Sequence, residues 1–133
     1  MPVIDASVLV EYLAGAEQAC SARTAVLTEI DHLWAPHLVD AEVGHVLRRA
    51  VAAGSIGVDD ATEALDDLRE LPIKRVSHLG LLGRAFELRS NMSFYDALYV
   101  ALAERLRTAL LTFDARLQRA AQSTIEVQLV GGG

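Results

Sequence analysis

The sequence contains a single cysteine and a single lysine, and it lacks any long run of apolar residues. Cys20 alone cannot form an internal disulfide, and a zinc site made of several thiolates is excluded as well. No apolar stretch approaches the roughly 20 residues needed to cross a bilayer, so no membrane segment is predicted. The first residues lack the basic start and apolar region of a secretory signal, which favours a cytoplasmic location.

An excess of positive charge is also missing. Lys and Arg total 12 against 18 Asp and Glu, and the formal net charge is −6. Proteins that coat nucleic acids usually have a basic surface and a high pI, so the composition disfavours that class. An enzyme that binds divalent cations through clustered carboxylates is still allowed, because each bound cation neutralises two of those charges. The four histidines show no metal-ligand spacing, although His37 and His45 can share a helix face.

The length of 133 residues suits a single domain, residues 1–133, with its own apolar core. Short apolar strands are predicted at residues 3–4, 33–35, 73–76, 109–111 and 127–129. Helical periodicity predicts helices at residues 7–13, 17–28, 36–54, 59–71, 78–90, 94–107 and 115–121. Short apolar strands separated by helices predict an α/β fold, a three-layer α/β/α sandwich with a mainly parallel, Rossmann-like sheet. Residues 131–133, three glycines, are predicted to form a flexible end.

Two aspartates follow predicted strands closely. Asp5 comes directly after the first strand, and Asp114 comes three residues after Leu111. Open α/β sheets bind ligands at the carboxyl ends of their strands, which makes both residues candidates for a functional site. A helix begins after each of them, so helix capping is the favoured interpretation of each aspartate when it is taken alone.

Asp96 lies in a segment, residues 94–103, that is apolar almost all round and is therefore predicted to be buried. No cation lies within one helical turn, so no local ion pair offsets the cost of desolvating the carboxylate. A functional role is the favoured interpretation. The alternative is that Ser93 and Asp96 form a capping box, in which an acid near the helix start is tolerated.

Glu42 belongs to the long helix predicted after Pro36 and has apolar neighbours at the three- and four-residue spacings. A functional role and a half-exposed helix position remain equally open for this residue. Asp40 points about 200 degrees round the helix from Glu42 and is predicted to be solvated. Arg48 and Arg49 are interpreted as a solvated helix face, with phosphate contacts as the alternative.

Several carboxylates without cationic partners suit Mg²⁺ or Mn²⁺, hard ions that prefer oxygen ligands and retain water. Phosphodiester cleavage is the chemistry that such a site favours. The ion lowers the pKa of a water molecule and stabilises charge on the phosphate, and a carboxylate that does not ligate it can serve as general base.

A family resemblance is carried by four segments in a fixed order. These are residues 3–10 (VIDASVLV), 36–43 (PHLVDAEV), 95–104 (YDALYVALAE) and 111–117 (LTFDARL). Together they resemble the PIN-domain ribonucleases, and specifically the VapC-type toxins of bacterial VapBC toxin–antitoxin modules. The resemblance covers the whole length of the chain.

The resemblance implies an acidic pocket and a set of partners. The pocket would consist of Asp5, Glu42, Asp96 and Asp114, with Mg²⁺ or Mn²⁺ held by Asp5 and Asp96 as principal ligands and by Asp114. Ser7 and Thr112 match hydroxyl positions beside that pocket, with local backbone capping as the alternative. Further implications are an RNA substrate cleaved at restricted sites, a homodimer, and a VapB-type antitoxin that inserts a basic side chain into the pocket.

Two other classes of function compete with the ribonuclease toxin. One is a catalytically silent interaction domain of the same fold, whose acids only bind a partner's arginines. The other is a Mg²⁺-dependent phosphatase or phosphotransferase on a Rossmann-like sheet. The latter needs a second acid two residues after the N-terminal aspartate, where this sequence has Ser7, so it is disfavoured.

Overall fold

A five-stranded sheet forms the centre of the computed structural model, which describes residues 1–15 and 19–130. The strands are β1 (Val3–Ile4), β2 (Trp34–Pro36), β3 (Lys74–Val76), β4 (Leu110–Thr112) and β5 (Val127–Leu129). Their order in the sheet is β3-β2-β1-β4-β5, and every neighbouring pair is parallel. All five predicted strands are therefore confirmed, with boundaries shifted by one residue at most at either end.

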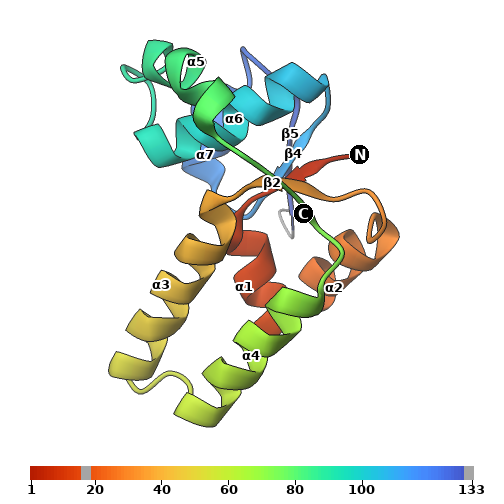
Figure 1. Cartoon of the computed structure of the whole chain (residues 1–133), viewed down its shortest axis with the longest axis vertical. Helices are drawn as coiled ribbons and strands as arrows, with labels where there is room; N and C mark the ends of the chain where they lie inside the picture. Colours follow the sequence, from red (N-terminus) through yellow and green to blue (C-terminus); the bar gives the residue numbers. More distant parts are fainter. Residues whose placement is uncertain (16–18, 131–133) are drawn as a thin grey trace.

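Helices cover both faces of this sheet, which confirms the predicted three-layer architecture (Figure 1). The connections from β1 through β2 to β3 run toward one edge of the sheet, whereas those from β3 through β4 to β5 run the other way. Because such crossovers are right-handed, the two groups of helices lie on opposite faces. One group contains α1 (Ala6–Ala14), α2 (Ala19–Thr28), α3 (Leu38–Ala52) and α4 (Val58–Glu70); the other contains α5 (Leu82–Glu87), α6 (Phe94–Leu106) and α7 (Ala115–Ala121).

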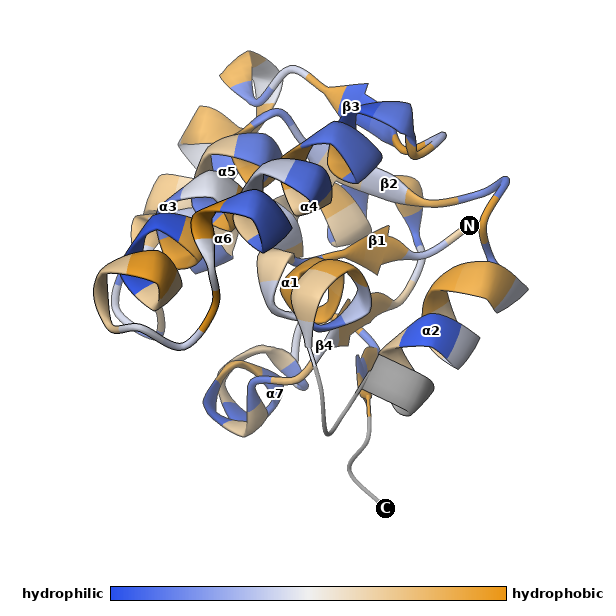
Figure 2. Cartoon of the chain, turned by 90° about the horizontal axis from the view of Figure 1, so that it is seen from below, coloured by the Kyte–Doolittle hydropathy of each residue, from blue (hydrophilic) through white to orange (hydrophobic). Residues whose placement is uncertain are grey.

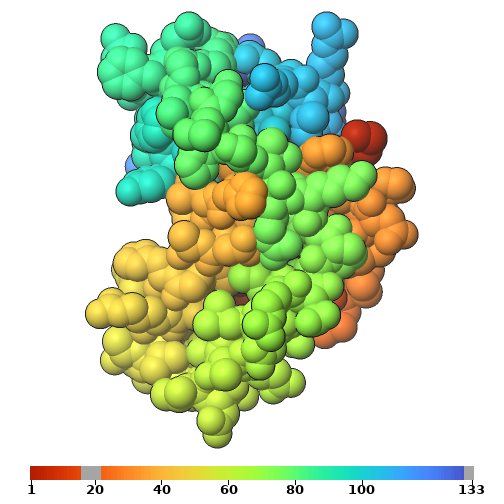
Figure 3. All heavy atoms as spheres, viewed as in Figure 1, coloured from red at the N-terminus to blue at the C-terminus, as the bar shows by residue number. Residues whose placement is uncertain are grey.

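The core lies where α1 and α6 contact the two sides of the sheet. Val3, Ile4 and Leu110 in the central strands are fully buried. Every residue of α6 from position 97 to 103 is buried, as its nearly continuous apolar sequence predicts. Figure 2 shows β1 and α1 mostly in apolar colours and α4 with a hydrophilic outer side. In the space-filling view, α3 and α4 form one end of the molecule, away from α5 and α6 (Figure 3).

Two predictions of secondary structure were wrong, one on where a helix begins and one on whether a segment forms a single helix. Pro36 does not open the long helix; it ends β2, pairs with Val76, and α3 begins at Leu38. The Trp34 backbone N–H donates to the Pro2 carbonyl, on the side of β1. Backbone donors point to the same side at every second residue, so the next donor toward β1 would be that of residue 36. The ring nitrogen of Pro36 has no hydrogen to donate, and pairing with β1 stops there. Residues 78–90 do not form one helix either, because only a 3₁₀ turn (Leu79–Leu81) and the short α5 form there. Gly80 and Gly83 lower the helix propensity of this segment.

Other expectations concern single side chains or residues outside the described part. The helical period places Leu65 near Leu68 on α4, but Leu65 is 43% exposed, whereas Leu68 is 4% exposed. The predicted start of the second helix at residue 17 and the flexible end at residues 131–133 lie outside the described residues. Among the described helices, none has the length and apolar character needed to cross a membrane.

Replacing two leucines of α4 by alanine should change the free energy of unfolding by different amounts, because one leucine is buried and the other is exposed. Leu68→Ala should lower the free energy of unfolding by about 2–5 kcal/mol, because it leaves a cavity against the core. Leu65→Ala, the matched change on the same helix, should cost about 0.5 kcal/mol or less. Urea unfolding of both variants measures the difference, and equal costs would show that α4 packs in another register.

Candidate active site

A cleft of about 520 Å³ opens at the carboxyl ends of β1 and β4. The two strands are the point where the direction of the connections reverses, and open α/β sheets bind ligands at such points. All four predicted acids and Ser7 line this cleft, whereas Thr112 lies buried beside it. The complete lining consists of Asp5, Ala6, Ser7, Leu38, Ala41, Glu42, His45, Val46, Tyr95, Asp96, Tyr99 and Asp114.

The Asp5 carboxylate is held by hydrogen bonds on both of its oxygens. Its Oδ1 accepts from the backbone N–H and the hydroxyl of Ser7, at 3.0 and 2.5 Å, and from the backbone N–H of Val8 at 3.4 Å. Its Oδ2 accepts from the Thr112 hydroxyl at 2.5 Å. The carboxylate is therefore fixed at the floor of the cleft, where Asp5 is only 7% exposed.

The two hydroxyls also connect the start of α1 to the segment after β4. Each has one proton, and each donates it to Asp5. As acceptors, Ser7 Oγ receives the Phe113 backbone N–H at 3.0 Å and Thr112 Oγ1 receives the Asp114 backbone N–H at 3.0 Å. Ser7 and Thr112 thus orient Asp5 and, through the backbone, fix the position of Asp114. The local backbone contact of Thr112 is therefore present, as the capping alternative has it, but Thr112 also reaches Asp5 across 107 residues of sequence.

Burial raises the pKa of Asp5 from its ordinary value of 3.8 to about 6. The hydrogen bonds from Ser7, Thr112 and Val8 act in the opposite direction, and the nearby charge of Asp96 raises the pKa further. A buried carboxylate is stabilised by a cation, and among residues 1–15 and 19–130 no arginine or lysine lines the cleft.

Two of the acids cap a helix and also line the cleft. Asp5 is the N-cap of α1, and Asp114 is the N-cap of α7, where its side chain accepts from the backbone N–H groups of Arg116 and Leu117. Asp114 itself is exposed at the rim of the cleft. The capping alternative is therefore correct for both residues and explains how their carboxylates are oriented.

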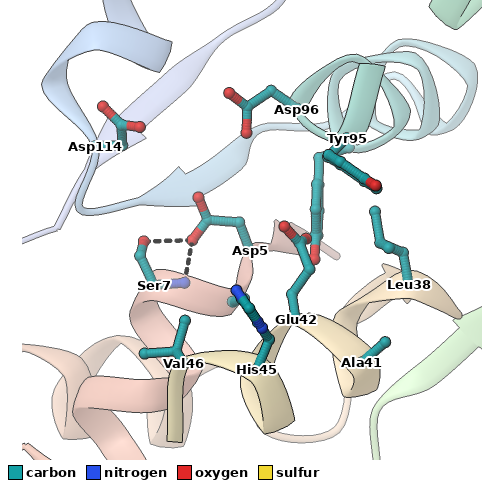
Figure 4. Close-up of a pocket in the computed structure, with 12 residues that line it drawn as sticks. Asp5, Ser7, Leu38, Ala41, Glu42, His45, Val46, Tyr95, Asp96 and Asp114 are labelled. Atoms are coloured by element: carbon teal, nitrogen blue, oxygen red, sulfur yellow. Dashed lines mark hydrogen bonds between the residues drawn. The ribbon is translucent and has the colours of Figure 1, made fainter. Parts of the chain in front are cut away.

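Asp96 projects into the same space from the first turn of α6 (Figure 4). The expectation of full burial was wrong: Asp96 is half-buried, and the preceding Tyr95 is 59% exposed. The reason is that this first turn forms the mouth of the cleft, whereas the apolar remainder of α6 lies in the core. The Asp96 backbone N–H donates to Ser93 Oγ at 3.1 Å, so the predicted N-cap is present as well.

The surroundings of Asp96 raise its pKa. Burial is the largest cause, and the charge of Asp114 adds to it. The Ser93 side chain and the charge of Arg116 lower the pKa but do not offset the burial. Arg116 is a cation that the local sequence did not reveal, because it belongs to α7, twenty positions further along the chain.

Glu42 reaches the cleft from α3, and its Oε1 is buried without a hydrogen-bond partner of good geometry among the described residues. Burial raises the pKa of Glu42; the nearby Tyr99 hydroxyl lowers it and the charge of Asp96 raises it. Burial also raises the pKa of Tyr99, so its phenol stays protonated beside Glu42. The half-exposed position predicted for Glu42 is observed, but its carboxylate faces the cleft.

Three cleft residues with aromatic or imidazole side chains, Tyr95, Tyr99 and His45, were not among the predicted site residues. Tyr99 and Tyr95 were treated only as part of an apolar helix, and His45 only as a distant partner of His37. His45 lies one turn after Glu42, and the helical period of α3 could have placed it in the cleft. His37, by contrast, is the residue before α3 and does not line the cleft.

Asp40 is outside the cleft, as its direction on the helix predicted, but it is not simply solvated. Arg75 on β3 donates to it from Nε at 2.7 Å and from a terminal nitrogen at 2.9 Å. Arg48 and Arg49 are exposed and do not line the cleft, in agreement with a solvated helix face.

The donor set fits a hard divalent cation in its chemistry. The cleft offers carboxylate oxygens from four separate segments of the chain, and one of these oxygens, Glu42 Oε1, is buried without a hydrogen-bond partner among the described residues. Within residues 1–15 and 19–130, however, no three acidic, histidine or cysteine side chains converge closely enough to hold an ion by themselves. Mg²⁺ does not require such a cage, because it often binds one or two carboxylates and completes its shell with water and phosphate.

Comparisons with known proteins agree with this architecture. The model of the PIN domain family matches residues 3–123. Ribonuclease VapC1 of Mycobacterium tuberculosis is 45% identical over 130 residues, covering 96% of each chain, and a VapC ribonuclease of Mycobacterium bovis is 40% identical, covering 98% of each. The crystal structure of VapC20, a sarcin–ricin loop cleaving toxin of M. tuberculosis, superposes with a TM-score of 0.72 at 18% identity, covering 90% of this chain and 95% of that one.

The fold, the acidic cleft and these matches define a class: the chain belongs to the PIN domain family. Within that family, the identity to the two mycobacterial proteins over nearly the whole length places it among the VapC-type members. The resemblance drawn from four sequence segments is therefore confirmed.

The raised pKa of Asp5 gives a prediction for stability in chelator. Between pH 4 and pH 6 the folded state retains a proton on Asp5 that the unfolded state has released, so this group's contribution to stability falls as pH rises and levels off above pH 6. The contribution amounts to at most about 3 kcal/mol, and Asp5→Asn should lack it. Urea unfolding from pH 4.5 to 7.5 should show the variant gaining stability relative to the parent as pH rises. A constant difference would contradict the raised pKa.

Proposed function

We propose that this protein is a Mg²⁺- or Mn²⁺-dependent endoribonuclease and the toxin component of a toxin–antitoxin pair. The observation that carries the proposal is the convergence of Asp5, Glu42, Asp96 and Asp114 on one cleft, which no lysine or arginine lines in the part of the chain that the structure describes. The relatives at 40–45% identity are named as ribonucleases, which supports RNA as the substrate.

Asp5 and Asp96 are the proposed principal metal ligands, because their carboxylates project into the same part of the cleft (Figure 4). Asp114 at the rim would complete the protein's share of the ligands, and Ser7 and Thr112 would hold Asp5 in place. When bound, the ion would neutralise charge on the scissile phosphate and lower the pKa of a water molecule.

Glu42 is the proposed general base. A base works best when its pKa approaches the working pH, and burial raises the pKa of this carboxyl. Its neighbour Tyr99 stays protonated and can donate to the carboxylate, which orients it toward the cleft. Glu42 would thus accept the proton of the attacking water, while Asp5 and Asp96 would hold the ion that neutralises charge on the phosphate.

A VapB-type antitoxin is the proposed protein partner. The crystal structure of VapBC2 from Rickettsia felis bound to a DNA fragment from their promoter has a similar fold, with a TM-score of 0.70 at 12% identity, covering 95% of this chain and 96% of that one. An arginine or lysine of the antitoxin inserted among four carboxylates would form strong charge-assisted hydrogen bonds. Homodimer formation and a cytoplasmic location remain predictions.

Cleavage of single-stranded or loop RNA should require both the divalent ion and the cleft acids. The purified protein should cleave in Mg²⁺ or Mn²⁺, stop in excess chelator, and lose at least about a hundredfold in rate on Asp96→Asn, which removes the carboxylate charge at nearly constant volume. Asp59→Asn, a change of an exposed acid on α4 outside the cleft, is the matched control and should leave cleavage unchanged.

Three results would contradict the proposal. Cleavage that persists in chelator would exclude the metal, and cleavage that Asp96→Asn and Asp59→Asn reduce equally would exclude the cleft. No cleavage under any of these conditions, in a folded protein that still binds its antitoxin, would favour the silent interaction domain.

A further inference from the structure

The cleft has two chemically different ends (Figure 4). Asp5, Asp96 and Asp114 lie toward one end, which we call the acidic end. At the other, apolar end, Tyr95 on α6 lies across from Leu38 and Ala41 on α3. The proposed function uses the acidic end and leaves the apolar end without a role.

Tyr95 is the most exposed aromatic residue of the cleft. Its side chain is 59% exposed, whereas Tyr99, one turn along the same helix, is 1% exposed. Among the described residues, none forms a hydrogen bond with the Tyr95 hydroxyl or places a cation over its ring. The ring is therefore available to a ligand, and it is adjacent in sequence to Asp96.

Charge attraction between the protein and RNA is limited at this place. The net charge is −6, and among the described residues no arginine or lysine lines the cleft, although the charge of Arg116 reaches Asp96. Contacts that do not depend on charge are therefore expected to contribute. Stacking of a nucleobase on an aromatic ring is such a contact, and single-stranded RNA is commonly recognised in this way because its bases are free to stack.

We propose that Tyr95, with Leu38 and Ala41, forms a nucleobase subsite that holds the base next to the scissile phosphate. The inference rests on the proposed function, since it takes the phosphate to lie at the acidic end. The base would stack on the Tyr95 ring and contact the two aliphatic side chains of α3. The cleft of about 520 Å³ is within the range of roughly 300–1,000 Å³ that ligand pockets have.

The test is a binding measurement that needs no catalysis. The four nucleoside 5′-monophosphates and ribose 5-phosphate, which lacks a base, are titrated in Mg²⁺ into the full chain and followed by NMR or calorimetry. At least one nucleotide should bind more tightly than ribose 5-phosphate, and Tyr95→Ala should reduce its affinity by about 5- to 150-fold, the range for losing one stacked base. Tyr95→Phe, which keeps the ring, should retain the preference.

Phe86→Ala is the matched control, because Phe86 is also 59% exposed but lies on α5 and does not line the cleft. It should leave nucleotide binding unchanged. The loss in Tyr95→Ala should be the same at low and high salt, since stacking releases no counterions. Thermal melts check that each variant is folded. Replacing an exposed ring should change the melting temperature little.

Equal binding of nucleotides and ribose 5-phosphate would overturn the subsite, and so would a nucleotide preference that Tyr95→Ala leaves intact. Metal-dependent RNA cleavage together with either result would leave the proposed function standing and remove only the subsite. Nucleotide binding that depends on Tyr95 in a protein without RNA cleavage would support the subsite and contradict the ribonuclease.

Discussion

The arrangement of the cleft depends on the hydrogen bonds that two hydroxyls donate to the buried Asp5 carboxylate. Ser7 belongs to α1, which starts directly after β1, and Thr112 is the last residue of β4. By meeting on Asp5, they join the two strands between which the sheet changes direction and set the backbone that carries Asp114. Both hydroxyl protons are used in this way, so the ionised carboxylate is the form that the network is built to hold.

The hydrogen bonds to Asp5 offset only part of the free energy that burying the carboxylates costs. Burial raises the pKa of Asp5, Glu42 and Asp96, which means that ionising each carboxyl costs more free energy in the folded apo protein than in the unfolded chain. A functional site often carries such a cost when the missing partner is a ligand. Here the partner proposed is a divalent cation during catalysis and a basic side chain of an antitoxin when the enzyme is inhibited. The same excess of negative charge accounts for both.

Much of the fold and the positions of the four acids could be predicted from the sequence. The strands are short apolar segments with helical segments between them, and parallel strands bring the residues after them to one edge of the sheet. Asp5 and Asp114 were placed in this way from local sequence alone. For Glu42 the helical period indicated a mostly apolar face, and for Asp96 a helix that is apolar almost all round predicted burial. A functional role was favoured only for Asp96 of these two, and the meeting of all four acids came from the family resemblance.

The features that could not be predicted depend on how distant segments pack. Arg75 pairs with Asp40 only because β3 lies beside β2, from which α3 continues. Thr112 reaches Asp5 because β1 and β4 are neighbours, although they are separated by more than 100 residues. The exposure of Tyr95 follows from the first turn of α6 standing at the cleft mouth, whereas its apolar sequence alone suggested burial. Periodicity within one helix does not contain this information.

A crystal structure of the protein soaked in Mn²⁺, with the ion located by its anomalous scattering, tests the central claim most directly. The account predicts a site within coordination distance of the Asp5 and Asp96 carboxylates, with Ser7 and Thr112 still donating to Asp5, and no such site in an Asp96→Asn crystal. Mn²⁺ bound only at exposed acids such as those of α4, with the cleft carboxylates free of it, would contradict the account.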